Sequence, residues 1–161
     1  MVAVAAVEWV KTTDGRSGIT VELPGKAEVR KVKATASVEG SPVEARVYGV
    51  DTADGGAGFS VHDMPGDRYP LEDNLQRFLD SYMVNTAEPL SSSDVRKHKV
   101  DGRAVLDARL TSEGGDGTLV GFTRLIADDD HLVQVIVLGP QAKEKALKAM
   151  HERLLDTLRI P

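Results

Sequence analysis

The chain has 161 residues, 41% of them hydrophobic and 28% charged, and these values favour one globular domain spanning residues 1–161. Its formal net charge of −5 argues against a nucleic-acid or anionic-membrane partner. Because the chain contains no cysteine, disulfides, thiol catalysis and thiolate metal sites are excluded.

The first ten residues, MVAVAAVEWV, form a short apolar segment. The segment lacks a basic leading region and is too short for a complete signal peptide or a membrane-spanning helix. Two interpretations stay open. Residues 1–10 form a leading strand or arm, or they are the trimmed start of a mature exported protein with Met1 supplied for expression.

The chain contains four Asp-Gly pairs, and this pair is typical of tight hairpin turns. The pairs lie at residues 14–15, 54–55, 101–102 and 116–117. Apolar and polar residues alternate between these pairs, which predicts strands at 19–23, 29–38 and 43–50 and a short strand around Phe59 and Val61. In the strand at 43–50 the alternation places Arg46 and Tyr48 opposite the apolar side chains.

After these strands the apolar spacing becomes that of a helix, and one stripe is formed by Leu71, Leu75, Phe78, Leu79, Tyr82 and Met83. The second half predicts strands at 103–111, 119–127 and 132–138, with the last two joined by the acidic turn Asp128–Asp130. The last two strands are apolar on both faces except at Arg124 and Gln134, which is typical of central strands. An amphipathic helix at 141–158 closes the chain, so the pattern predicts an α+β domain.

Several segments resemble the PsbP-like, or Mog-like, superfamily, and they lie in the family's order. Trp9 precedes Gly18 and the strand ending VELPG, and the Tyr-containing strand RVYGV, the mid-chain helix, the hairpin GFTR to VQVIV and the final helix follow. The resemblance implies an α/β/α sandwich with a central antiparallel sheet of about six to seven strands. It also implies a binding or assembly role without catalysis or cofactor. The superfamily includes many small bacterial lipoproteins and exported proteins.

A first group of polar residues, His62, Asp63, Asp67 and His131, has side chains that bind divalent metals. His131 joins this group only if the fold brings the two loops together. The competing interpretation is a strand end that runs into a polar turn, where aspartate is common. We expect the polar turn, and no metal.

The acidic turn Asp128–Asp130 is a second candidate, because three carboxylates attract cations. Calcium loops space their ligands at alternate positions around a glycine, and that spacing is absent here. A solvated hairpin tip is the favoured interpretation.

A polar stripe formed by Asp107, Arg109, Arg124 and Gln134 interrupts the apolar strands. If the hairpins pair in sequence order, these side chains lie together on one face of the sheet. Buried arginines need partners, so an Asp107–Arg ion pair is expected. The functional alternative is a groove that binds a carboxylate or phosphate through arginine.

Nucleophilic catalysis and nucleotide binding have no motif in this chain. No Gly-x-Ser-x-Gly surrounds a serine, and no Gly-Lys-Ser/Thr follows the glycine-rich segments. The serines of Ser91–Asp94 are interpreted as a turn or helix cap. The sequence therefore favours a non-enzymatic binding or assembly domain of the bacterial cell envelope, such as the soluble part of a lipoprotein, whose partner is a protein or another envelope component. The alternatives are a cytoplasmic interaction or regulatory domain and, ranked lower, a metal-dependent hydrolase.

Overall fold

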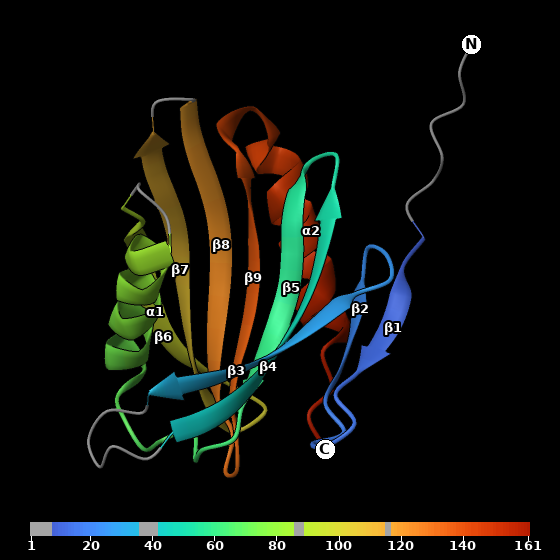
Figure 1. Ribbon diagram of the computed structural model, residues 1–161, viewed down its shortest axis with the longest axis vertical. Helices are drawn as coiled ribbons and strands as arrows, with labels where there is room; N and C mark the ends of the chain where they lie inside the picture. The colour runs from blue at the N-terminus through green and yellow to red at the C-terminus, as the bar shows by residue number, and fades with distance from the viewer. Residues whose placement is uncertain (1–7, 36–41, 86–88, 115–116) are drawn as a thin grey trace.

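The computed structural model describes residues 8–35, 42–85, 89–114 and 117–161 (Figure 1). The strands are β1 (Val10–Thr13), β2 (Thr20–Leu23), β3 (Glu28–Thr35), β4 (Pro42–Thr52), β5 (Gly55–His62), β6 (Ser91–Val100), β7 (Arg103–Gly114), β8 (Gly117–Ala127) and β9 (Leu132–Pro140). The helices are α1 (Leu71–Asn85), the short 3-10 helix η1 (Gln141–Lys143) and α2 (Glu144–Thr157).

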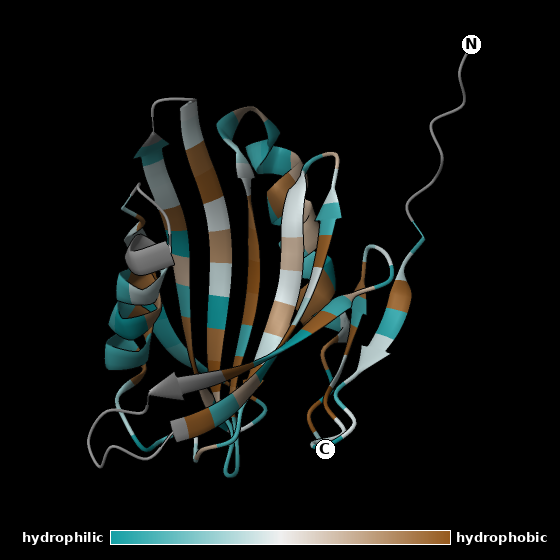
Figure 2. Ribbon diagram, in the orientation of Figure 1, coloured by the Kyte–Doolittle hydropathy of each residue, from teal (hydrophilic) through white to brown (hydrophobic). Residues whose placement is uncertain are grey.

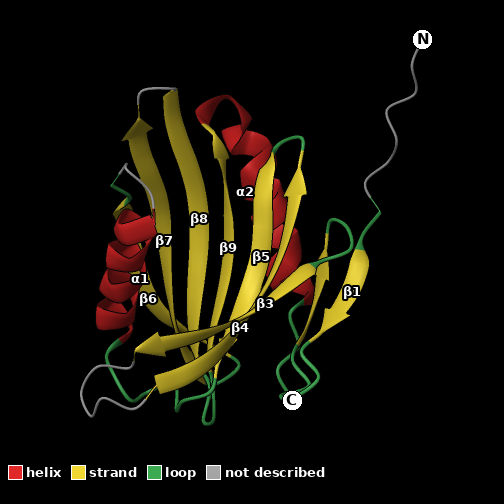
Figure 3. Ribbon diagram, viewed as in Figure 1, coloured by secondary structure: helices red, strands yellow, loops and turns green. Residues whose placement is uncertain are grey.

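Seven strands form one antiparallel sheet in the order β3-β4-β5-β9-β8-β7-β6, and β1 and β2 form a separate hairpin (Figure 3). The expected sheet of about six to seven strands, with one mid-chain helix and a C-terminal helix, is therefore confirmed. The central strands β8 and β9 carry buried residues on both faces, and Figure 2 shows β9 as almost wholly hydrophobic.

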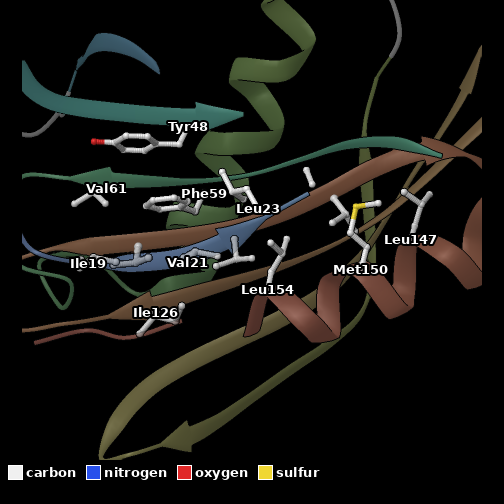
Figure 4. Close-up of a cluster of buried hydrophobic side chains, with 14 of the residues drawn as sticks. Ile19, Val21, Leu23, Tyr48, Phe59, Val61, Ile126, Leu147, Met150 and Leu154 are labelled. Atoms are coloured by element: carbon white, nitrogen blue, oxygen red, sulfur yellow. The ribbon is translucent and has the colours of Figure 1, made fainter. Parts of the chain in front are cut away.

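The two faces of the sheet are covered by different elements. On one face α2 and β2 pack over a core that includes Val21, Phe59 and Leu154 (Figure 4). On the other face α1 packs over a second core that includes Leu75 and Leu106. We call these the α2 face and the α1 face. The expected α/β/α arrangement follows from this division, with the β1–β2 hairpin as an added element on the α2 face.

Helix α1 begins and lies where the sequence predicts. Pro70 precedes its first residue, and the acidic residues Glu72 and Asp73 lie in its first turn, where they complement the helix dipole. The apolar stripe is turned to the sheet, since Leu71, Leu75 and Leu79 are buried. The helical spacing of the sequence therefore gave the correct buried face.

Strand β6 corrects one expectation. The segment Ser91–Asp94, interpreted as a turn or helix cap, is the first part of this edge strand and pairs with β7. The register shifts between Ser93 and Arg96, which marks a β-bulge, and Asp94 adopts a positive φ of 51° there. Pairing with the long neighbouring strand overrides the local preference of serine and aspartate for turns.

Two other differences concern the chain before α1. A leading strand was expected within residues 1–10, and residues 1–7 lie outside the described residues. The structure has strand β1 at Val10–Thr13, so the strand extends beyond the expected segment. Strand β5 is longer than the short strand expected around Phe59 and Val61. The glycines at the start of β5 have no side chains, so the alternation that predicts a strand is absent there. Glycine is needed at position 58, because a Cβ there would lie 2.2 Å from the Tyr48 carbonyl oxygen. Residues 36–38 of the strand expected at 29–38 also lie outside the described residues.

Candidate binding site

Asp107 lies at the centre of a polar cluster on the α2 face. The guanidinium of Arg124 on β8 donates to both of its carboxylate oxygens, from Nε at 2.7 Å and from Nη2 at 3.0 Å. On the other side Nε2 of His98 on β6 lies 2.6 Å from Oδ2 of Asp107. Burial alone would raise the pKa of Asp107, but the bonds from Arg124 and His98 outweigh it and lower that pKa. We call His98, Asp107 and Arg124 the Asp107 cluster.

Arg109 lies on the same face two residues along β7, and it is tied to the helix. Its Nη2 and Nε donate to Glu144 at the start of α2 over 2.7 and 3.1 Å. The hydrogen bonds that Arg109 donates to Glu144 raise the pKa of Arg109. Three of the four residues of the predicted polar stripe thus lie on one face, and the expected Asp107–Arg ion pair is present.

The expectation that Gln134 lies beside them is wrong. Arg124 pairs with Val135 of β9, so Gln134 points to the α1 face. There its Nε2 donates to Oγ1 of Thr123, which donates to the carbonyl of Val135. A shift of one residue in register moves a side chain to the opposite face, and the sequence did not fix that register.

A pocket of about 490 Å³ opens beside the Asp107 cluster, between the β6–β7 turn, strands β7 and β8, and the end of α2. It exists because α2 packs over β8 and β9, while the β6–β7 side of the α2 face lacks a helix among the described residues. Its polar lining comes from Asp101, Arg103, Arg124, Asp156 and Arg159, and its apolar lining from Val100, Val105, Ile126, Leu155, Leu158 and Ile160. We call it the arginine pocket.

His151 of α2 lies over the same part of the sheet, where its ring stacks on Phe122 with centroids 6.1 Å apart. Its side chain is buried, and its Nδ1 has no hydrogen-bond partner in the described part of the chain. Burial lowers the pKa of His151 to about 4, with Asp107 opposing and Arg124 reinforcing the shift. The imidazole is therefore neutral in the folded protein at neutral pH.

We expect His151 to make the protein less stable as the pH falls from about 6.5 to about 4. In this range His151 is protonated in the unfolded state but stays neutral in the folded state. The free energy of unfolding therefore decreases by up to about 1.4 kcal/mol for each unit by which the pH falls. His151→Phe keeps the stacked ring and removes this dependence. Urea denaturation at several pH values measures it, with Glu152→Gln on the same helix as the control. An equal slope in His151→Phe would contradict a neutral His151.

A second polar network, which the sequence analysis missed, fastens the β1–β2 turn to the sheet. Asp14 in that turn is 0% exposed, and it accepts hydrogen bonds from Arg46 Nε at 2.6 Å and Nη2 at 3.1 Å. The hydroxyls of Tyr48 and Ser17 also donate to Asp14. The other edge of Arg46 donates to Asp63 over 2.7 and 2.8 Å. We call these five residues the Asp14 network.

The electrostatics of the Asp14 network hold it in one charge state. Burial alone would raise the pKa of Asp14, but the bonds from Arg46, Ser17 and Tyr48 outweigh it and hold that pKa well below its usual value. Burial, with the bond to Asp14, raises the pKa of Tyr48 to about 12. The hydrogen bonds from Arg46 also lower the pKa of Asp63. Asp14 and Asp63 are thus both ionised and both paired with Arg46, and Arg16, 3.3 Å from Asp63, supplies a second positive charge.

The structure brings together part of the predicted metal group. Nε2 of His131 lies 3.7 Å from Oδ1 of Asp63. The two residues come together because the β5–α1 loop contacts the β8–β9 turn at Gly66. A side chain at position 66 would prevent this contact, since its Cβ would lie 2.5 Å from the Cα atom of Ala127. His62 turns instead to the hydroxyl of Ser60 at 3.2 Å, and Asp67 is exposed. Asp63 is already occupied by Arg46. Among the described residues no group of three or more His, Cys, Asp or Glu could hold a metal ion.

The three aspartates of the acidic turn have different surroundings. Asp128 is half-buried, accepts a hydrogen bond from Arg103 Nε at 2.9 Å, and lies 3.7 Å from Nδ1 of His131. Asp129 and Asp130 are exposed. The turn therefore connects the Asp14 network, through His131 and Asp63, to Arg103 at the arginine pocket.

Neither α1 nor α2, nor any other helix in the described ranges, has the length and apolar character needed to cross a bilayer.

No family model matches the chain, and no curated protein matches its sequence. Solved structures do resemble it. The cyanobacterial PsbP, CyanoP, of Synechocystis sp. PCC 6803 superposes with a TM-score of 0.67 at 11% identity, covering 100% of this chain and 97% of its own. The Ran-binding protein Mog1p of Saccharomyces cerevisiae does so with a TM-score of 0.55 at 13% identity, covering 96% of both chains. PA94 of Pseudomonas aeruginosa, a protein of unknown function, gives 0.50 at 12% identity, with 95% and 96% covered. The chain therefore has the Mog1p/PsbP-like fold over its full length.

Proposed function

We propose that this protein is a non-enzymatic binding domain that holds its partner at the arginine pocket. The observation that carries the proposal has two parts. The pocket is open to a partner, and the carboxylates of the polar clusters around it are paired with arginines, so they are not free for catalysis. Asp107, Asp63 and Asp128 each accept hydrogen bonds from an arginine. Such carboxylates are poor general bases, because their oxygens are occupied by guanidinium groups.

The pocket has the mixed lining that binding sites use. Apolar walls supply contact area, and a small number of fixed polar groups supply orientation. Val100, which lines the pocket, is 37% exposed and therefore accessible to a partner, as are Val29, Val32 and Val95 elsewhere. The likeness to a Ran-binding protein supports a binding role, although the fold by itself identifies no partner.

The compartment we propose is the bacterial cell envelope, with this domain as the soluble part of a lipoprotein or exported protein. This part of the proposal is supported by the sequence's resemblance to the exported branch of the superfamily. The partner would be a protein or another envelope component. A cytoplasmic interaction or regulatory domain is the alternative.

Site-specific photo-cross-linking in living cells tests both parts. A photoreactive phenylalanine analogue replaces Val100 at the pocket rim, and a matched control replaces Asp73, which is exposed on α1 on the opposite face. We expect a discrete adduct from position 100 but not from position 73, recovered in the envelope fraction. An adduct in the cytosol would favour the alternative compartment. Equal labelling from both positions, or none from position 100, would overturn the proposed binding surface.

A further inference from the structure

Strand β6 forms one edge of the main sheet, and its outer side has no neighbouring strand in the described part of the chain. In an antiparallel pair every second residue turns its backbone N–H and C=O groups away from the neighbour, so an edge strand presents unpaired donors and acceptors. After the bulge, the register with β7 runs without interruption from Arg96 to Val100. We call the segment Arg96–Val100 the β6 edge, and it is regular enough to pair with another extended chain.

The β6 edge carries three exposed cationic side chains, Arg96, Lys97 and Lys99, and no acidic one. Lys97 lies 3.0 Å from Glu72 on α1, but both side chains are more than half exposed, so this ion pair is weak. Lys99 has no hydrogen bond or ion pair within the described ranges. Arg96 is opposite Asp107 in the register, but the oxygens of Asp107 already bond to the other members of the Asp107 cluster. Two of the three cations therefore have no carboxylate partner among the described residues.

Acidic and aliphatic side chains lie at the two ends of this segment. Asp94 lies in the bulge, where its charge acts on Arg109, and Asp101 lies in the turn to β7. Val95 precedes the β6 edge and Val100 ends it, and they are 45% and 37% exposed. A partner therefore meets positive charge along the middle and an apolar contact at either end.

These charges disfavour a second copy of this chain as the occupant. A symmetric antiparallel pair of strands is centred on one residue, because directly opposite side chains lie on the same face of the sheet. A centre at Arg96, Lys97 or Lys99 places that cation opposite itself, and a centre at His98 places Lys97 opposite Lys99. Like charges directly opposite each other are destabilising. The occupant is therefore a different chain, with the opposite charge.

Lysines on an edge strand prevent pairing with most other strands, and this is their usual role. An acidic strand removes that penalty and adds pairs of opposite charge, so the same lysines select for it. The other edge strand, β3, also carries exposed cations, Arg30 and Lys31. The β6 edge differs because its last residue, Val100, also lines the arginine pocket. A chain added to β6 therefore continues onto the surface proposed to hold the partner.

We propose that the β6 edge binds an extended acidic segment of the partner protein, which adds to the sheet through backbone hydrogen bonds. Lys97 and Lys99 lie on the α1 face, opposite Leu106 and Ala104, so the segment carries acidic residues at alternate positions. Its other side chains lie on the α2 face, where an aliphatic one contacts Val100. The inference rests on the proposed function, since the segment belongs to the partner held at the arginine pocket.

Nuclear magnetic resonance titration of the isotope-labelled full chain tests the inference. The probe is a short peptide in which glutamate and valine alternate, acetylated and amidated so that only its side chains are charged. We expect saturable shifts of the backbone amide resonances of β6 and β7, and slower hydrogen exchange of the outward amides of the β6 edge. The same peptide with glutamine in place of glutamate should bind about 10-fold more weakly, because the pairs of opposite charge are lost. The acidic peptide with every amide nitrogen methylated should not bind, since it cannot donate to a strand.

Matched variants at the two edges of the sheet place the binding. Lys99→Glu is expected to weaken binding of the acidic peptide about 5-fold, because it replaces an attractive pair with a repulsive one. Lys31→Glu on β3 makes the same change in net charge at an exposed residue and should leave binding unchanged. The spectrum of each free variant reports whether it folds. If Lys99→Glu does not fold, Lys99→Gln decides.

Four results would overturn the inference: no saturable binding of the acidic peptide, equal binding of its methylated form, shifts centred on β3, or equal weakening by Lys99→Glu and Lys31→Glu. Shifts in β6 that depend on protein concentration without peptide would assign this edge to a second copy instead. Failure of the inference is distinct from failure of the proposed function. An adduct from position 100 with no peptide pairing at the β6 edge would retain the arginine pocket and reject the added strand.

Discussion

Arg46→Met is expected to lower the free energy of unfolding by about 3–5 kcal/mol, because it leaves a buried carboxylate without its counter-charge. Asp14 is 0% exposed and Arg46 is 5% exposed, so water cannot replace the lost guanidinium. For a chain of this size the melting temperature should fall by about 6–20 °C. Urea denaturation followed by circular dichroism measures the change.

The control is a second arginine that contacts Asp63, the other carboxylate to which Arg46 donates. Arg16 lies 3.3 Å from Asp63, but its side chain is 65% exposed, so Arg16→Met should cost less than about 1 kcal/mol. If Arg46→Met fails to fold, Tyr48→Phe removes a single hydroxyl bond to Asp14 and should cost about 1.5–3 kcal/mol. Similar losses in Arg46→Met and Arg16→Met would contradict the role of burial.

Leu154→Asp is expected to unfold the protein or destabilise it severely, since it places a charge in the core between α2 and the sheet. Leu154 is fully buried, and Figure 4 shows it with Leu147 and Met150 on the side of α2 that faces β2. The milder Leu154→Ala should lower the free energy of unfolding by about 2–5 kcal/mol, through lost contacts and the cavity left behind.

Thermal and urea denaturation of both Leu154 variants measure these losses, and Glu152→Ala on the exposed side of the same helix serves as the control. That substitution should change the free energy of unfolding by no more than about 0.5 kcal/mol. An unchanged melting temperature for Leu154→Asp would refute the packing of α2 on the sheet.

The periodic part of the fold could be predicted from the sequence because it depends on neighbours in the chain. Alternation located β2, β3, β4 and β7, near-continuous apolar runs located β8 and β9, and helical spacing located α1 and the C-terminal helix. The first part of strand β6, Ser91–Asp94, was interpreted as a turn or helix cap, because its pairing with β7 rather than its own residues decides its conformation. Gln134 was placed on the wrong face for a related reason, because its face depends on a register between strands.

The polar sites were harder to predict than the strands. The Asp107–Arg124 pair was found because both residues interrupt apolar strands, which demands a partner. Asp14 and Arg46 gave no such signal. Asp14 reads as an ordinary turn residue beside glycine, and Arg46 alternates with apolar residues as an exposed side chain would. Both are buried because the β1–β2 hairpin lies over that face, and only the folded chain brings Asp14 to Arg46, 32 residues later.

The attachment of β2 has a consequence for the order of folding during synthesis. Thr20 and Arg159 exchange backbone hydrogen bonds at 3.0 and 2.9 Å, and the core residues of β2 pack on α2. The β1–β2 hairpin is synthesised before α2, and its final contacts form only after Arg159 has emerged from the ribosome. Until then Ile19, Val21 and Leu23 have no helix to cover them, and transiently exposed aliphatic strands of this kind promote aggregation.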